Sequence, residues 1–420
     1  MNNQPSNFLR PCSGERFFRF VALALLALMA ATAPLWLPIG FAGTDAADYP
    51  PIPSLPLPVA ALASLGWIGL ALVLIGVVAI LFRPQRTRLW WFPFSGLLLL
   101  FVVDQQHLQP WAIQCCLYAM LLASLSWQQA RPWIIAIAIS IYCYSATGKL
   151  DYQFAQTVGT QFVRTLLSPL MGVEKGVAAK LALLLPSAEL GFAILIAIPK
   201  TRRLGGALAI VMHITLIGLL GPWSLNHSYG VLMWNTVLAV QSALLFLPQP
   251  AGDQASSASE SSERGQGQAS MPWVGYVARG VVVLALLAPL SERFGYWDHW
   301  ASWALYAPHS SRALIQIHET SASELPESLR KTLLESQFDD RWLTLDLGQL
   351  SLQQRWVPVY PQARYQLQWA AKLAQTFSLA DGIRVIVKST ADRRTGQRDE
   401  RYLLGQEEVV SAADEYFLGR

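Results

Sequence analysis

The chain has 420 residues, of which 53% are hydrophobic and only 14% are charged. Soluble domains carry about 25% charged residues, so this composition excludes an ordinary soluble protein and indicates repeated passage through a lipid bilayer. The net charge of +4 is spread over loops and forms no basic block of the kind that binds nucleic acid.

Nine apolar segments predict a polytopic all-α membrane bundle. Each membrane span needs roughly 20 apolar residues, and the third to fifth segments are shorter than that. We expect a multi-span membrane domain over residues 16–248, and a last span with an external juxtamembrane segment over 272–308. The nine segments cover residues 17–37, 59–82, 92–103, 110–125, 133–147, 177–198, 204–220, 229–247 and 273–290.

Two clusters of arginine and lysine, at residues 83–88 and 199–203, set the expected orientation. Short cytoplasmic loops are enriched in these residues. With nine spans, the N-terminus (1–15) is then cytoplasmic and the chain after the last span is outside. The Ser/Gln/Gly-rich stretch 249–271 has no apolar face and is expected to be a flexible cytoplasmic linker. In a bacterium this would be a protein of the inner membrane.

The C-terminal part, 309–420, has a different pattern, with dense charges of both signs and no cysteine. Helical periodicity over 363–377 predicts a helix. Alternating apolar and basic residues at 383–387 predict a strand, 391–398 a loop, and 402–404 the returning strand. We therefore expect a small extracytoplasmic α+β domain, with no nucleophile motif and no metal pattern.

The stretch from Trp133 to Gly172 is the most informative, because its apolar run ends in polar and aromatic residues that include Lys149. A lysine at the centre of a bilayer costs roughly 2.5–3.5 kcal/mol, and less near an interface. One interpretation is that Lys149 reaches the headgroups beside Asp151. The other is that its amine is partly dehydrated, loses its proton more easily and can serve as a base. The amphipathic piece 159–175 is expected to lie in the membrane interface.

Other ionisable or polar residues fall within or at the ends of the predicted spans. Such groups usually face the interior of a helix bundle and pair with one another, which predicts a polar pocket on the external side. The alternative is that Glu189 pairs with His213 or Lys180 for structural reasons alone. The pocket candidates beside Lys149 are Asp104, His107, Asp151, Glu189, His213, Asn226 and His227.

The run Tyr142-Cys143-Tyr144-Ser145-Ala146-Thr147-Gly148-Lys149-Leu150-Asp151-Tyr152-Gln153-Phe154 carries a resemblance to a known family. It resembles the segment around the active-site lysine of vitamin K-dependent gamma-carboxylase and of the wider HTTM (horizontally transferred transmembrane) family. In that segment an aromatic residue and a small-residue stretch precede Lys-Leu-Asp. The likeness covers most of residues 90–245. Phe154 departs from it, because the family has a tryptophan there, and the tail is smaller than the carboxylase's lumenal domain.

The resemblance implies a function. Lys149 would be the base that deprotonates a reduced naphthoquinone (a vitamin K-like quinol), and His107 the second catalytic candidate. Oxygen and carbon dioxide would be co-substrates of a quinol-dependent oxidation or carboxylation, a lyase-class activity that implies no metal. An exported protein or peptide would be the substrate.

A different class of function also fits the sequence. In this alternative the protein is a non-catalytic membrane scaffold, or a partner of an export or oxidation system, and Lys149 is a structural anchor. Replacing Lys149 with alanine would then leave function intact. Transport through the polar pocket is the weakest alternative, because no pair of interrupted helices is evident.

Overall fold

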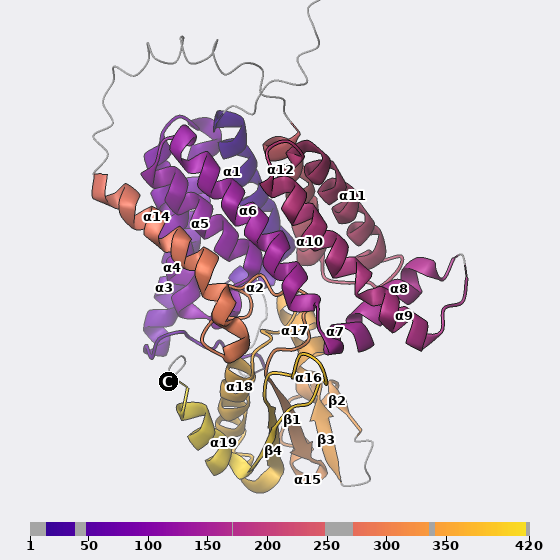
Figure 1. Ribbon diagram of the computed structural model, residues 1–420. Coiled ribbons are helices and arrows are strands. Elements are labelled where there is room, and N and C mark those ends of the chain that lie inside the picture. Colours follow the sequence, from indigo (N-terminus) through magenta and orange to yellow (C-terminus); the bar gives the residue numbers. More distant parts are fainter. Residues whose placement is uncertain (1–13, 38–47, 170, 248–271, 336–340, 417–420) are drawn as a thin grey trace, which may run out of the picture.

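A computed structural model describes residues 14–37, 48–169, 171–247, 272–335 and 341–416. Helices fill one end of the molecule, and the C-terminal part, with its sheet, lies at the other end (Figure 1). The predicted linker 249–271 and all but the last two residues of the predicted cytoplasmic N-terminus lie outside the described residues.

Among the described residues, the N-terminal part consists of helices joined by loops, without strands. Several short elements, among them the 3-10 helices η2 to η4, separate the longer helices. In chain order the elements are α1 (Gly14–Ala31), α2 (Ala33–Trp36), α3 (Val59–Phe82), η2 (Thr87–Trp90), α4 (Trp91–Val103), η3 (Gln105–His107), α5 (Pro110–Ser124), α6 (Trp127–Lys149), α7 (Tyr152–Gln156), α8 (Val158–Leu167), α9 (Lys175–Ala182), α10 (Leu184–Ala197), α11 (Arg202–Leu220), α12 (Tyr229–Phe246), α14 (Pro272–Leu287) and η4 (Ala288–Phe294).

Five helices in the described part of the chain are long and apolar enough to cross a membrane: Ala60–Phe82, Lys175–Ala197, Arg202–Leu220, Tyr229–Phe246 and Trp273–Phe294. Two shorter apolar helices, Thr87–Val103 and Pro110–Ser124, accompany them. A helical protein with apolar helices of membrane-spanning length is confirmed, whereas nine spans are not.

Two of the predicted spans are not among the helices of membrane-spanning length and apolarity, and the structure shows why. The predicted first span divides into α1 and α2 at Thr32, just before Pro34, whose ring nitrogen has no hydrogen to donate. The predicted fifth span is part of α6, whose first turns contain polar residues, including Arg131.

Helix α6 is central to the packing. It contacts α10, α10 contacts α11, and α11 contacts α12. Two adjacent glycines let α11 approach its neighbours closely. A Cβ atom on Gly205 would lie 2.7 Å from the backbone nitrogen of Ile196 on α10, and one on Gly206 would lie 2.6 Å from Cβ of Phe246 on α12. Neither contact leaves room for a side chain.

The C-terminal part is an α+β unit built on a five-stranded antiparallel sheet with strand order β2-β3-β1-β4-β5. Helix α18 packs on β1 and β4 and buries Tyr365, Trp369 and Leu373. Its elements are β1 (Arg312–His318), α15 (Glu319–Ala322), α16 (Glu327–Arg330), β2 (Leu333–Leu334), β3 (Trp342–Leu345), α17 (Leu347–Arg355), α18 (Ala363–Thr376), η5 (Ala380–Gly382), β4 (Ile383–Lys388), β5 (Glu400–Leu404) and α19 (Gly405–Asp414).

The sequence patterns of this part are confirmed in detail. The predicted helix at 363–377 is α18, and the two predicted strands are β4 and β5, which pair antiparallel with Val385 opposite Leu403. The side of the membrane on which this unit lies stays a prediction.

Buried polar contacts join the C-terminal part to the helical part. Gln105 donates to Gln368 at 2.9 Å, Gln106 donates to Ser351 at 2.7 Å, and Tyr365 donates to Gln106 at 2.9 Å. Each of these side chains is buried. A buried donor or acceptor that loses its partner costs about 1–3 kcal/mol, so these contacts fix how the two parts meet.

Candidate functional site

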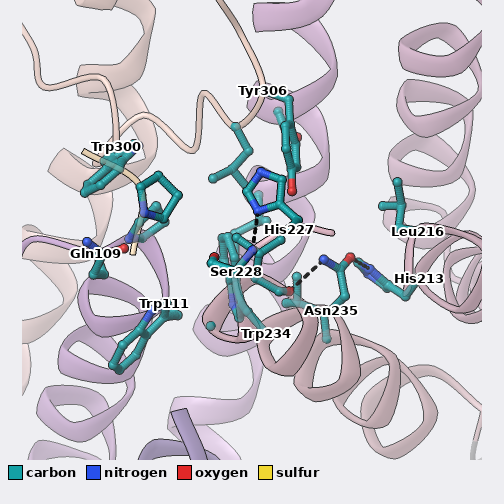
Figure 2. Close-up of a pocket in the computed structure, with 18 of the residues that line it drawn as sticks. Gln109, Trp111, His213, Leu216, His227, Ser228, Trp234, Asn235, Trp300 and Tyr306 are labelled. Atoms are coloured by element: carbon teal, nitrogen blue, oxygen red, sulfur yellow. Dashed lines mark hydrogen bonds between the residues drawn. The ribbon is translucent and has the colours of Figure 1, made fainter. Parts of the chain in front are cut away.

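A cavity with a volume of about 210 Å³ lies where the two parts meet. Helices α5, α6, α10, α11 and α12 form most of its wall. The segment between η4 and β1 contributes Trp300, Leu305 and Tyr306, and the C-terminal part contributes residues 357–358. Figure 2 shows its aromatic side chains, with Trp300 and Trp111 on one side and Tyr306 beside His227. The polar or aromatic lining residues are Gln109, Trp111, Tyr142, Ser145, Lys149, Glu189, His213, His227, Ser228, Trp234, Asn235, Trp300 and Tyr306.

Lys149 faces this cavity and is paired within it. Its Nζ donates to Glu189 Oε2 at 2.5 Å and to Ser145 Oγ at 3.0 Å. The two charged side chains are only 12% and 10% exposed. Glu189 was expected to pair with His213 or Lys180 if its role were structural, and the structure instead pairs it with Lys149. The cavity therefore contains an ion pair, largely withdrawn from water.

The C-terminal end of α6, which carries Lys149, is held in place by the C-terminal part. The last carbonyl groups of a helix have no partners within the helix. Arg393 supplies partners here, donating to the carbonyl oxygens of Leu150 at 2.8 Å and Thr147 at 3.0 Å. The backbone of Arg393 also accepts from the amide of Tyr152 at 3.0 Å. The loop at 391–398 thus holds the end of α6 in place, and with it the position of Lys149 in the cavity.

A buried hydrogen-bond chain on α6, α11 and α12 forms another part of the cavity wall. His213 Nδ1 lies 3.0 Å from Asn235 Oδ1, and Asn235 donates its amide to the Val231 carbonyl at 2.9 Å. Since the Asn235 oxygen can only accept, His213 carries its proton on Nδ1 and accepts at Nε2. Tyr142 must then donate to His213 at 2.9 Å, and Ser242 to Tyr142 at 2.9 Å.

A second buried chain fixes the indole of Trp234. Its Nε1 donates to Gln114 Oε1 at 3.0 Å, and Gln114 donates to Gln241 at 2.8 Å. The Tyr118 hydroxyl also donates to Gln241, at 3.1 Å. Because the partners of Trp234 are themselves buried and bonded, its ring is a rigid wall of the cavity.

The lining of the cavity also holds polar groups whose hydrogen-bonding capacity is not fully used. The Tyr306 hydroxyl and Ser228 Oγ are buried without a hydrogen-bond partner. His227 accepts from the Ser228 amide at 2.9 Å and packs edge-on against Tyr306 at 5.5 Å. Burial raises the pKa of the Tyr306 hydroxyl and lowers the pKa of the His227 imidazole below its ordinary value of 6.5. Both groups are therefore neutral at pH 7.

Asp104 and His107 lie elsewhere. They line a separate, smaller cavity together with Arg355. The two ring nitrogens of His107 face the carbonyl oxygens of Leu100 at 2.6 Å and Leu35 at 2.8 Å. His107 thus has both nitrogens engaged, and the structure does not bring it to Lys149.

The other two predicted pocket residues do not line the cavity either. Asp151 accepts from the amide of Phe154 at 3.0 Å, at the start of α7, and pairs with Arg293 at 3.0 Å. Asn226 is exposed and adopts a left-handed backbone conformation with φ of 48°. Among the predicted residues, the cavity therefore brings together Lys149, Glu189, His213 and His227.

No family model matches the chain, and no curated protein or solved structure matches it. The resemblance around Lys149 thus stays a prediction. What the site can do is inferred from its geometry: a largely apolar cavity with three tryptophans, one ion pair and two hydroxyl groups that lack a hydrogen-bond partner.

Proposed function

We propose that this integral membrane protein binds a reduced naphthoquinone in the Lys149 cavity and uses the Lys149–Glu189 pair to take up its proton. This is the first step of a quinol-dependent oxidation or carboxylation. The observation that carries the proposal is the placement of the ion pair: 12% and 10% exposed, and facing an aromatic cavity instead of bulk water.

The residues present fit such a ligand. An apolar cavity of roughly 150 Å³ accommodates benzene, so about 210 Å³ has room for a larger ring system. Trp111, Trp234 and Trp300 offer aromatic faces and edges, which favour offset or edge-on contact with another ring. The buried hydroxyl groups of Tyr306 and Ser228 lack partners, and two hydroxyl groups of a quinol would satisfy them.

Lys149 and Glu189 would have different roles in the proton transfer. Because Lys149 already donates to Glu189, the lysine is the charged partner and the carboxylate is the group able to accept a further proton. Glu189 Oε would take the hydroxyl proton, and the Lys149 ammonium would compensate the negative charge left on the ligand oxygen. Tyr142 and His213 sit behind the pair as a fixed hydrogen-bond chain. When bound, the quinol would supply the reducing equivalents for oxygen.

The resemblance to vitamin K-dependent gamma-carboxylase and HTTM proteins leads to the same ligand class. It adds oxygen and carbon dioxide as co-substrates and an exported protein or peptide as acceptor. The positive-inside pattern of the loops supports an external position for the cavity mouth. The lumenal domain that holds substrates in the carboxylases has no cysteine-linked counterpart in the tail of this chain, so the acceptor would be held differently.

The test is turnover in a reconstituted membrane. The full chain is placed in lipid nanodiscs with a reduced naphthoquinone and oxygen, and epoxide formation is followed by chromatography. Lys149→Met and Glu189→Gln are each expected to abolish product. The matched control is Lys180→Met, because Lys180 is exposed on α9 and does not line the cavity.

Product formation that is equal in the wild type and the Lys149→Met variant would end the proposal. Quinol binding without any product in the wild type would instead favour the scaffold alternative, in which Lys149 and Glu189 only hold helices α6 and α10 together. Binding is followed through quenching of tryptophan fluorescence, since three tryptophans line the cavity.

A further inference from the structure

A second cluster of ionisable side chains lies outside the Lys149 cavity, between the last apolar helix and the sheet. Glu292 lies in η4, His299 in the turns that follow, and His309 three residues before β1 begins at Arg312. One ligand atom from each of the three residues lies within 4.8 Å of the others. Among the described residues, this is the one group of three or more His, Cys, Asp and Glu side chains with that geometry.

The two imidazoles converge on a single carboxylate. His299 Nδ1 lies 2.6 Å from Glu292 Oε1, and His309 Nε2 lies 3.0 Å from Oε2 and 3.2 Å from Oε1. The rings meet edge to face, with centroids 5.0 Å apart. The side chains of His299 and His309 are 2% and 0% exposed, and that of Glu292 is 9% exposed.

The donor set and its spacing suit a divalent transition metal. Zn²⁺ binds imidazole nitrogen at about 2.0–2.1 Å and carboxylate oxygen at about 2.0–2.2 Å in tetrahedral geometry. Ligand atoms around such an ion are therefore about 3.3 Å apart. The imidazole nitrogens lie 2.6 to 3.2 Å from the carboxylate oxygens, and all three ligand atoms lie within 4.8 Å of one another, so small shifts of the side chains would admit an ion.

The cluster borders an open groove at the surface. Glu292 lines this groove together with Gly295, Asp298 and Ser310, whereas His299 and His309 are buried behind it. Two histidines and one carboxylate are a donor set that zinc and non-haem iron sites use with positions left open for water. The groove would give an ion a route to the Glu292 carboxylate.

The position of the cluster gives it a structural consequence. The segment from Glu292 to His309 connects the last apolar helix to the sheet and has little regular structure beyond η4. The His309 carbonyl accepts from the Ala391 amide at 2.8 Å, in the loop whose Arg393 holds the end of α6. A metal ion would close this segment into a loop and tie the last helix to the sheet.

We propose that Glu292, His299 and His309 form a binding site for one divalent transition metal ion of the Zn²⁺ class. The site is separate from the Lys149 cavity, and none of its three residues lines that cavity. The bound ion would fasten the C-terminal part to the last apolar helix. Replacing one of the three residues is therefore expected to weaken metal binding and to lower the stability of the protein.

The test uses the full chain in detergent, purified through a tag without histidines and freed of metal by a chelator. Co²⁺ is titrated in, and its visible d–d absorption is followed. We expect one Co²⁺ per chain, with an absorption typical of four-coordinate Co²⁺, displacement by Zn²⁺, and a higher melting temperature with either metal.

Two variants are compared with a matched control. His309→Gln and Glu292→Gln are expected to weaken Co²⁺ binding by more than about tenfold, since the loss of an outer-shell partner alone costs about 10–100-fold. Glu292→Gln keeps the shape of the side chain, so it serves if His309→Gln does not fold. The control is His318→Gln, because His318 lies in β1 outside the cluster and should leave binding unchanged.

An absence of stoichiometric Co²⁺ binding by the folded wild-type chain would overturn the proposal. Equal Co²⁺ affinity in the wild type and in Glu292→Gln would overturn it as well. In either case the three side chains form a hydrogen-bonded cluster without an ion.

Discussion

Replacing Glu189 with glutamine tests the ion pair that the site is built on. The substitution keeps the shape of the side chain and removes its charge, so the ammonium group of Lys149 keeps Ser145 as a partner but loses its counter-ion. Both side chains of the pair are nearly withdrawn from water, at 12% and 10% exposed. We therefore expect a large loss of stability.

The magnitude follows from the burial of the pair. Removing one partner of a buried pair costs about 3–5 kcal/mol, because it leaves an uncompensated charge. The Lys149–Glu189 pair is not fully buried, so the expected loss for Glu189→Gln lies toward the lower end of this range, at about 3 kcal/mol.

The assay is thermal unfolding of the purified protein, followed by tryptophan fluorescence. A loss of that size lowers the melting temperature by several degrees, since each kcal/mol shifts it by about 2–4 °C in a domain of 150–250 residues. The control is Glu174→Gln, which removes a carboxylate that is exposed at the start of α9.

A double variant, Lys149→Met with Glu189→Leu, removes both charges and should be more stable than Glu189→Gln alone. If Glu189→Gln is as stable as Glu174→Gln, the pair carries no such energy and the reasoning fails.

Three further predictions concern the surroundings of the pair. Tyr142→Phe leaves His213 Nε2 buried without a donor and should cost about 1–3 kcal/mol in unfolding free energy. Arg393→Ala removes two bonds to the last carbonyls of α6, so amide hydrogen exchange at residues 148–152 should accelerate, without a change at α12. Because burial lowers the pKa of His227 below 6.5, the unfolded chain binds a proton there before the folded chain does. The stability that His227 contributes is therefore full above about pH 6.5 and falls below it, and the melting temperature of His227→Gln should fall less with acid than that of the wild type.

Much of the fold could be predicted from composition and periodicity. The alternation at 383–387 and the periodic apolar residues of 363–377 are local signals, and each gave the element that the structure contains. The number of spans could not be predicted in the same way. Residues 127–132 belong to α6 although Gln128, Gln129 and Arg131 are polar, and Thr32 and Pro34 interrupt an apolar run that looked continuous.

The site was predicted in outline, because an ionisable residue in an apolar segment must find a partner. The choice of partner depends on tertiary packing. Glu189 lies 40 positions from Lys149, and only the contact between α6 and α10 selects that pairing over His213 or Lys180. No sequence pattern identified Tyr306 or Trp300 as cavity residues, because they reach the cavity from a segment far along the chain.

The Glu292, His299 and His309 cluster was missed for a related reason. Its residues lie seven and ten positions apart, which matches none of the short metal-binding spacings. Turns between η4 and β1 bring the three residues together, and the spacing of residues along the sequence does not predict these turns.

The central claim is that an aromatic quinol occupies the cavity beside Lys149, and photo-crosslinking measures this most directly. A photoreactive naphthoquinone is irradiated with the full chain in nanodiscs, and labelled peptides are identified by mass spectrometry. The structure predicts labels on α6 near residue 149, on residues 227–235 and on residues 300–306, all reduced by an excess of unlabelled quinone. Labels confined to the exposed apolar side chains of α3 or α14, or insensitive to that competition, would contradict the account.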